Sequence, residues 1–325
     1  MLDVFITIDT EFYPLWPDWR SAGLARDIDR DIYGQTARGQ FGVSYQLDVL
    51  AAHGLKASFF VEGLFAGATG DDVLRRLIAE IRSKGQEIQL HLHPEWLQWM
   101  ENPPVPKNGR ETIDEYSASE QRQLIAIAKE SVSNAGAQNI CAFRAGDYAA
   151  NAGTLQALSA NGIDIDTSFN ACYVKSLGDV AALREADQPV EVSEIWEFPV
   201  AVWSDGLGSY RHAQLCSCSS AEMQGALLSA WKNGWNCFVI VSHSFELLKK
   251  RRKRISHPSP DPIVVRRFSQ LCEFLQANRD KFRTRHFGDI DLSTLRNGAE
   301  LARPIRSPAY RTAWRMAEQT CRRLS

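Results

Sequence analysis

The chain begins with Met1-Leu-Asp-Val-Phe-Ile-Thr-Ile-Asp-Thr-Glu11, a stretch that combines a strand with two acids at its end. Residues 4–8 are apolar or β-branched, as is typical of a strand buried on both faces of a parallel sheet. Asp9 and Glu11 are two residues apart, so their side chains point to the same side of an extended chain. Because ligands collect at the carboxyl ends of strands in α/β proteins, the two acids indicate a functional site, with solvated acids in a turn as the alternative.

Strand and helix patterns alternate along the rest of the chain. We predict strands at 57–61, 87–92, 140–143, 163–165, 192–199, 236–242 and 282–287, and helices at 43–53, 71–84, 117–134, 151–160, 221–233 and 262–278. This alternation predicts an α/β fold with a parallel-strand core and right-handed crossovers, and the number of units favours a closed barrel over an open sheet. The barrel domain is expected at 1–293 and a basic, helical C-terminal tail at 294–325.

Residues 12–40 are expected to form a long loop after the first strand. The aromatic residues Tyr13, Trp16 and Trp19 in this loop are expected to pack in the core, with a sugar-stacking wall as the alternative. Long loops at strand ends are often functional.

The composition is that of an ordinary soluble domain. Of 325 residues, 44% are hydrophobic and 23% charged, and the formal net charge of −2 gives no overall preference for nucleic acid. Seven scattered cysteines indicate reduced thiols, and Cys216-Ser-Cys218 lacks the second pair that a cysteine metal site needs. Without a secretory signal or an apolar span, the expected location is the cytoplasm.

Polar and ionisable side chains recur where the predicted strands end, and parallel strands would bring them to one mouth. They are Asp9, Glu11, His91, His93, Arg144, Asp147, Asp166, Ser168 and His243. Two histidines at i, i+2 with a carboxylate make a sound ligand set for a divalent metal, whereas a single histidine is more often structural. Asp9 could take a proton from water, His243 could protonate a leaving group, and Arg144 could hold a carboxylate.

At these residues the chain resembles the polysaccharide deacetylases, the nodulation-protein-B homology group also called carbohydrate esterase family four. The matching segments, in the family's order over about residues 2–248, are Thr7-Ile-Asp-Thr-Glu11, His91-Leu-His-Pro-Glu-Trp96, Phe143-Arg-Ala-Gly-Asp-Tyr148, Asp166-Thr-Ser168 and Val241-Ser-His-Ser-Phe245. The resemblance implies a distorted (β/α)7-type barrel. It also implies Asp9 as catalytic base, His243 as general acid and Arg144 as the residue that orients the base. The implied substrate-binding residues are Asp147, Asp166, Ser168 and Trp96.

Two departures from the family pattern concern the metal. The family commonly has a second Asp beside the catalytic base, whereas this chain has Thr10, so Glu11 is the expected carboxylate ligand. The usual His-x-x-x-His spacing would reach Glu95, whereas the second histidine here is His93. The implied ligands are therefore Glu11, His91 and His93, with Glu95 as an alternative ligand, and the implied metal is zinc, with cobalt, nickel, iron or manganese also open.

The resemblance predicts a metal-dependent deacetylase that removes N- or O-linked acetyl groups from a carbohydrate or glycan intermediate. The segment Glu87-Ile-Gln-Leu-His-Leu-His-Pro94 also resembles a small subgroup linked to surface-polysaccharide gene clusters. Two alternatives are an amidase for a small non-sugar amide and a non-catalytic carbohydrate-binding homologue. The basic segments 249–254 and 308–324 could contact a membrane surface. A solvated loop is the default for 249–254, and docking of a helix against the barrel explains 308–324 equally well.

Overall fold

The computed structural model describes residues 1–15, 19–173, 176–183, 186–249, 258–295 and 304–324. The predicted basic segment 249–254 therefore lies outside the described residues, apart from Lys249. No helix within the described ranges is both long and apolar enough to cross a membrane. The seven cysteines, all within these ranges, are free thiols.

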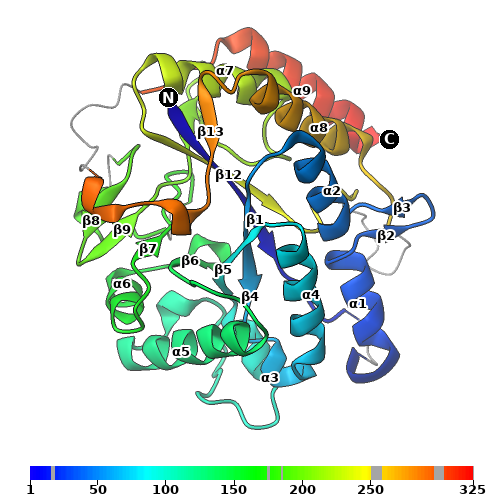
Figure 1. The fold of residues 1–325 in the computed structure, drawn as a ribbon, viewed down its shortest axis with the longest axis vertical. Helices are drawn as coiled ribbons and strands as arrows, with labels where there is room; N and C mark the ends of the chain where they lie inside the picture. The colour runs from blue at the N-terminus through cyan, green and yellow to red at the C-terminus, as the bar shows by residue number, and fades with distance from the viewer. Residues whose placement is uncertain (16–18, 174–175, 184–185, 250–257, 296–303, 325) are drawn as a thin grey trace.

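A curled, mostly parallel sheet runs through the molecule (Figure 1). Its strands follow the order β12-β1-β4-β5-β6-β7-β9, in which all neighbours are parallel, and β13 also pairs with β1. The bounds are β1 Leu2–Thr10, β4 Ser58–Glu62, β5 Glu87–Leu92, β6 Ala142–Ala145, β7 Ile165–Asp166, β9 Ile195–Glu197, β12 Cys237–His243 and β13 Phe282–Thr284.

The sheet forms a half-barrel that is closed by a bridge. Beyond β9 the order ends in β8 (Val190–Val192), which is antiparallel to β9. The gap between β9 and β12 is spanned by the chain after β9, where Val200 pairs with Val239 of β12. The predicted distorted barrel with a parallel core is confirmed. The domain boundary at residue 293 stays a prediction, because residues 296–303 lie outside the described ranges.

The alternating side chains of β1 divide the core into two regions and direct the acids. Val4, Ile6 and Ile8 belong to the large apolar cluster that includes the helices, whereas Phe5 belongs to the smaller cluster inside the barrel. Because side chains alternate along a strand, Asp9 lies on the same face as Phe5. The acid is thus directed into the barrel mouth, above an interior filled by aromatic rings.

Helices cover the outside of the sheet, each through an apolar face. In α4 this face is made by Leu74, Leu77, Ile78 and Ile81, at the spacing of an amphipathic helix. The predicted capping box at Ser117 is present, since the Ser117 side chain accepts a hydrogen bond from the Glu120 amide. The bounds are α2 Val43–His53, α3 Ala66–Thr69, α4 Asp72–Ser83, α5 Ala118–Asn134, α6 Ala152–Ser159, α7 Ser220–Lys232 and α8 Pro262–Ala277.

The segment after β1 is the main correction to the predicted elements. The predicted loop at 12–40 contains helix α1 (Leu24–Asp31), together with an irregular helical turn at Trp19–Gly23 and a short hairpin of β2 (Gln35–Thr36) and β3 (Gly39–Gln40). Most residues of α1 are charged, and Ile28 is its one side chain that is both apolar and buried. The apolar face of this helix is therefore hard to recognise in the sequence. The predicted strand at 192–199 is also shorter, since β8 ends at Val192 and β9 covers only Ile195–Glu197.

The aromatic residues of this segment divide into core and surface. Trp19 is buried against Trp96 and Trp99, which confirms the predicted packing role for this ring. Tyr13 instead keeps 36% of its surface exposed. Trp16 lies outside the described residues.

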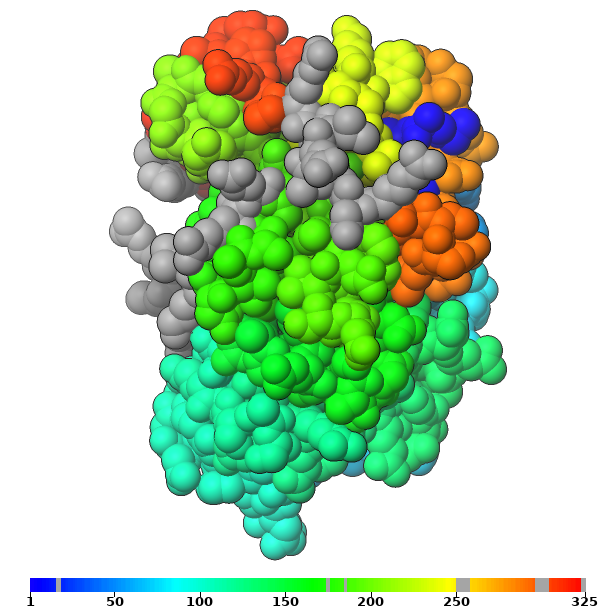
Figure 2. Space-filling model, turned by 90° about the vertical axis from the view of Figure 1, so that its left-hand side faces the viewer, coloured from blue at the N-terminus to red at the C-terminus, as the bar shows by residue number. Residues whose placement is uncertain are grey.

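The C-terminal helix α9 (Ala309–Leu324) docks on α7 and on the β10–β11 hairpin (Val202–Ser204 and Tyr210–His212). Arg315 Nε lies 3.1 Å from Glu222 Oε1 of α7, and both side chains are buried. Thr312 Oγ1 donates to the Asp205 carbonyl oxygen at 2.7 Å. Figure 2 shows this helix in red at one end of the molecule, beside the yellow-green hairpin segment. Its outer side leaves Tyr310 and Trp314 exposed.

The buried pair gives a test of how the helix is held. Arg315→Ala is expected to lower the free energy of unfolding by about 3–5 kcal/mol, because it leaves the Glu222 carboxylate buried without its cation. Arg306→Ala removes the same charge at an exposed position and is expected to change the free energy of unfolding by less than about 0.5 kcal/mol. Urea denaturation of the three proteins measures the difference, and equal effects would contradict the pairing.

Candidate metal centre

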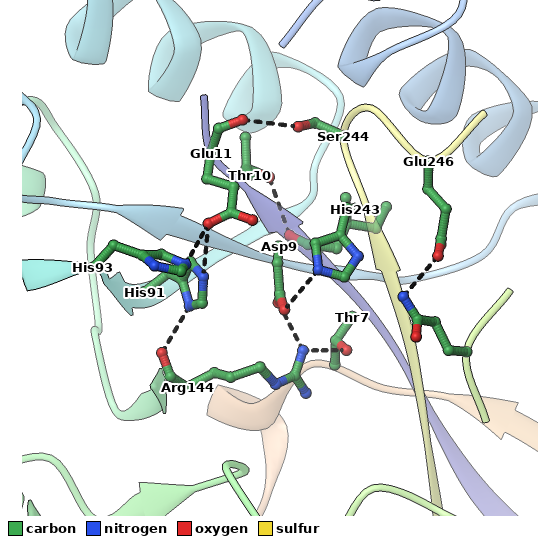
Figure 3. Close-up of polar contacts among 12 residues, drawn as sticks. Thr7, Asp9, Thr10, Glu11, His91, His93, Arg144, His243, Ser244 and Glu246 are labelled. Atoms are coloured by element: carbon green, nitrogen blue, oxygen red, sulfur yellow. Dashed lines mark hydrogen bonds and ion pairs between the residues drawn. The ribbon is translucent and has the colours of Figure 1, made fainter. Parts of the chain in front are cut away.

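The ends of adjacent parallel strands bring the predicted site residues together. Asp9 of β1 lies opposite His243 of β12, and His91 of β5 lies opposite Arg144 of β6. Asp147 follows β6 directly, in a turn where it adopts a φ of 55°. The predicted mouth at the carboxyl ends of the strands therefore exists, as Figure 3 shows for the labelled side chains.

Glu11, His91 and His93 offer three ligand atoms that lie within 4.8 Å of one another. Glu11 Oε2 is 2.5 Å from His93 Nε2 and 3.2 Å from His91 Nε2. Two imidazole nitrogens and one carboxylate oxygen match a divalent-metal site that keeps coordination positions open.

The outer nitrogens of both rings are oriented as in metal sites. His91 Nδ1 lies 2.7 Å from the Arg144 carbonyl oxygen, to which it can donate, and this contact orients Nε2 toward the position that a metal would occupy beside Glu11. His93 Nδ1 lies 3.6 Å from Glu95 Oε1. Glu95 therefore lies beside Nδ1 of His93, whereas Glu11 lies beside Nε2, and its role as an alternative ligand stays a prediction. The residues present fit a divalent metal.

Charges within the trio shift the pKa values of its members. Burial raises the pKa of Glu11, but His93 and His91 outweigh this effect and hold it well below its usual range. Burial lowers the pKa of His93, but the charges of Glu11 and Glu95 outweigh this effect and raise it to about 10. The metal-free trio thus holds a carboxylate and a protonated imidazole at neutral pH. Metal binding must displace that proton.

The turn after β6 packs against the ring of His93. A Cβ atom on Gly146 would lie 2.5 Å from atoms of the His93 ring, so this position requires glycine. Asp147, the next residue, lines the cavity beside the trio. Its predicted role in substrate binding is consistent with this position and stays a prediction.

Asp9 is held by Arg144 and faces His243. Arg144 Nη1 donates to Asp9 Oδ1 and to Thr7 Oγ1, each at 2.7 Å, and its Nε donates to the Thr167 carbonyl oxygen at 3.1 Å. The other oxygen of Asp9, Oδ2, lies 3.9 Å from His243 Nε2. Asp9 therefore has one oxygen fixed by a buried guanidinium and the other beside the histidine (Figure 3).

Three predicted substrate-binding residues are almost completely buried. Asp166 and Ser168 have no exposed surface, and the Ser168 hydroxyl donates to Asp166 while accepting from the Ala145 amide. Trp96 is 2% exposed and packs against Phe12. Asp166 and Ser168 thus offer no accessible surface, whereas Trp96 lines a second cavity of about 270 Å³, and the predicted role of the three residues in substrate binding stays a prediction.

Asp166 forms a buried carboxyl pair with Glu197, its register partner on β9. Burial raises the pKa of Asp166, and burial together with the charge of Asp166 raises the pKa of Glu197 well above its usual range. The pair therefore retains a shared proton to a higher pH than isolated carboxyl groups do. Glu197 ends a strand as the predicted residues do, so its position could have indicated it.

Glu62 is a second site residue that the sequence analysis missed. It ends β4, lies opposite His91 and accepts hydrogen bonds from the amides of Leu64, Phe65 and His93. Burial raises its pKa to about 7, although these hydrogen bonds act in the opposite direction. The strand-end pattern that selected Asp9 applies to Glu62 as well.

A cavity of about 300 Å³ opens above these groups. The sequence analysis did not predict the wall of this cavity that contains Gln214 and Glu246. Gln214 Nε2 donates to Glu246 Oε1 at 2.8 Å, and His212 Nε2 lies 2.7 Å from Gln214 Oε1. The lining residues are Asp9, Glu11, His91, His93, Ala145, Asp147, Tyr148, Tyr173, Gln214, Cys216, His243, Phe245, Glu246, Leu248 and Arg322.

Comparisons with known proteins bear on the fold. No protein-family model and no curated protein matches the sequence. Among solved structures, the chain is similar to a proposed polysaccharide deacetylase from Mycobacterium smegmatis, with 17% identity over 94% of each chain and a TM-score of 0.55. It is also similar to a 4-alpha-glucanotransferase from Thermococcus litoralis, with 10% identity and a TM-score of 0.51, over 90% of this chain and 40% of that one.

A family 4 carbohydrate esterase from Streptomyces lividans matches with 11% identity and a TM-score of 0.43, over 94% of this chain and 97% of that one. At these identities a likeness concerns the fold. The fold-level resemblance to the polysaccharide deacetylases, predicted from the five segments, is confirmed.

The shared proton of Asp166 and Glu197 predicts a pH dependence of stability. Both folded-state pKa values lie above the unfolded ones, so the contribution is fully present below about pH 4 and is lost as the pH rises through the raised values. In metal-depleted protein, Glu197→Gln should reduce the fall in unfolding free energy between pH 5 and 9 by up to about 1.4 kcal/mol per unit. Glu194→Gln, at an exposed position, is the control. Urea titrations measure the unfolding free energy at each pH. If this free energy depends on pH in the same way in all three proteins, the shared proton is ruled out.

The metal trio predicts proton-coupled metal binding. Because His93 is protonated in the metal-free protein and must bind as the neutral imidazole, zinc uptake at pH 7 should release about one proton, and the apparent affinity should rise about tenfold per pH unit. Calorimetry in buffers of different ionisation enthalpy measures this release. His91→Ala should weaken binding more than about 100-fold, since even indirect partners of a metal cost ~10–100-fold. His53→Ala is the control, and an unchanged affinity in His91→Ala would refute the site.

Proposed function

We propose that the protein is a metal-dependent deacetylase that removes N- or O-linked acetyl groups from a carbohydrate or glycan intermediate. The observation that carries this proposal is the placement of the Glu11, His91 and His93 trio beside the Asp9–Arg144 pair and His243, in one cavity. A metal trio next to a carboxylate and a histidine is the set of groups that hydrolysis of an acyl bond requires.

The trio would hold a divalent metal, with zinc the first candidate and cobalt, nickel, iron or manganese open. When bound, the metal would act as a Lewis acid on the acyl carbonyl oxygen. Glu11 supplies the negative charge, the Arg144 carbonyl oxygen orients the His91 ring at 2.7 Å, and Glu95 Oε1 lies 3.6 Å from His93 Nδ1.

Asp9 is proposed as the general base. Its Oδ1 is occupied by Arg144, so Oδ2 is the oxygen that takes the proton from the attacking water. The Arg144 guanidinium stays charged and fixes the plane of the carboxylate, because it is also bonded to Thr7 and Thr167.

His243 is proposed as the general acid. Its Nε2 lies 3.9 Å from Asp9 Oδ2, so the acid and the base flank the same space. As the acyl carbon–nitrogen or carbon–oxygen bond breaks, His243 gives a proton to the departing amine or hydroxyl. Water supplies the oxygen of the released acetate, and the deacetylated sugar leaves.

Two alternative functions stay open. A small non-sugar amide would need the same trio and the same acid and base, so an amidase differs only in what fills the cavity. A non-catalytic carbohydrate-binding protein would need neither the Asp9–Arg144 pair nor His243. A peripheral membrane contact through 308–324 is supported by the exposure of Tyr310 and Trp314 and stays a prediction, as does the cytoplasmic location.

Acetate release from acetylated amino-sugars tests the proposal. Asp9→Asn should lower kcat by about 10²–10⁴-fold while metal content is unchanged, because general-base catalysis contributes that much. His91→Ala should lose activity and metal together. Asp72→Asn, the same change at an exposed position, is the control.

If the wild-type protein contains no metal and releases no acetate, the proposed enzymatic function is wrong. Acetate release that survives both substitutions would overturn the assignment of the residues.

A further inference from the structure

The C-terminal helix α9 turns its charged side chains toward the protein, where it packs on α7 and α8 (Figure 1). Arg315 is buried against α7, and Arg322 pairs with Asp261, which caps α8. Glu318 Oε2 lies 2.8 Å from Arg267 Nη2 of α8. A helix on a protein surface normally directs its charged side chains to the solvent and its apolar ones to the core. In α9 this arrangement is reversed.

The side of α9 that faces the solvent is apolar. In the described part of this helix, every exposed residue is uncharged. Tyr310 and Trp314 are 68% and 63% exposed. Together with the exposed residues Ala313, Ala317 and Cys321 they recur at intervals of three and four, so they lie along one side of the helix. We call these five residues the outer face of α9.

The β10–β11 hairpin adds exposed apolar side chains beside the start of α9. Its turn packs closely on the segment that leads into the helix, because a Cβ atom on Gly206 would lie 2.5 Å from the Ser307 carbonyl oxygen. Leu207 in this turn and Tyr210 after it are both exposed. Of the nine large apolar side chains that are exposed among the described residues, five lie on this hairpin and on α9. Such a concentration is typical of an interaction surface.

The charge distribution indicates which partner fits the outer face. A helix that lies on an anionic lipid surface uses lysine and arginine side chains beside its apolar side. In α9, Arg315 and Arg322 are paired with acids of the protein, and the guanidinium of Arg311 lies against Gly225 of α7. In a two-fold symmetric dimer the same patch meets itself, so a charged patch would repel its copy. The uncharged outer face therefore fits a second copy of this chain.

The shape and area of this surface suit the same partner. In an antiparallel pair with its two-fold axis between residues 315 and 316, the large ring of Trp314 would lie beside the small side chain of the partner's Ala317. A standard interface takes about 800 Å² from each partner. Tyr210, Tyr310 and Trp314 are each about two-thirds exposed, so they would supply roughly half of that area. Leu207 and the smaller residues between the rings would add to it.

We propose that the protein is a homodimer in which the outer face of α9 packs against the same face of a second copy. This inference is independent of the proposed deacetylase activity. Arg322, near the end of the same helix, lines the cavity above the metal trio. Pairing would therefore hold in place the helix that supplies part of that cavity wall.

Sedimentation equilibrium of the full chain measures the association. The wild type should be dimeric at about 10 μM protein, which corresponds to a Kd of ~1 μM or tighter. Trp314→Glu should weaken the dimer at least about 30-fold, because a ring at the centre of an interface carries much of its binding energy. Ala317→Glu, on the same face, should act in the same direction. Trp231→Glu, the same change at an exposed ring at the end of α7, is the matched control and should leave the dimer intact.

A mixture of two charge variants tests the two-fold arrangement. Trp314→Glu and Trp314→Lys should each be monomeric, since like charges would meet near the axis. Their equimolar mixture should associate more strongly than either variant alone, because opposite charges would then meet. Thermal unfolding followed by circular dichroism should match the wild-type monomer for both variants, since position 314 is exposed.

Three results would overturn the dimer. They are a wild type that stays monomeric at about 100 μM, a dimer that Trp314→Glu and Ala317→Glu leave intact, and a mixture that associates no better than its components. A monomeric wild type that binds phosphatidylglycerol vesicles, and loses this binding in Trp314→Glu, would also overturn it and would assign the outer face to a lipid surface.

Discussion

Arg144 is the group on which the rest of the site depends. Its side chain is fully buried, and a charge buried in this way must be paired and hydrogen-bonded. The guanidinium meets this requirement by binding Asp9 and Thr7 on β1 and the Thr167 carbonyl beyond β7, while the Arg144 carbonyl oxygen fixes the ring of His91 on β5. One residue thus connects the proposed base to the metal ligands, so a shift of β6 would disturb both.

The two acids at the end of β1 act independently because each has its own cationic partner. Asp9 faces Arg144, whereas Glu11 faces His93, which is protonated in the metal-free protein. Two uncompensated carboxylates so close together would raise each other's pKa. Separate partners remove that conflict, so one acid can serve as a base while the other serves a metal.

Walls of the two cavities beside the metal trio come from segments outside the regular strand–helix alternation. Tyr13 and Arg30 belong to the segment between β1 and α2, Gln214 and Glu246 follow β11 and β12, and Arg322 comes from the C-terminal helix. The half-barrel carries the proposed metal ligands, base and acid, and these additional segments shape the cavities around them. This division agrees with the general pattern in which a conserved architecture carries variable loops at its catalytic face.

The sequence by itself determined the elements with strong periodicity and the acids, histidines and arginine at their carboxyl ends, because parallel strands bring consecutive ends to one mouth. It did not reveal α1, whose charged residues hide its apolar face, or the burial of Asp166 and Trp96, since a motif specifies residue types and not accessibility. Only the tertiary structure decided that Glu95 lies beside His93 Nδ1, that Glu62 accepts from the His93 amide and that Glu246 lines the cavity. These relations join residues far apart in the chain, so packing and not local sequence fixes their distances.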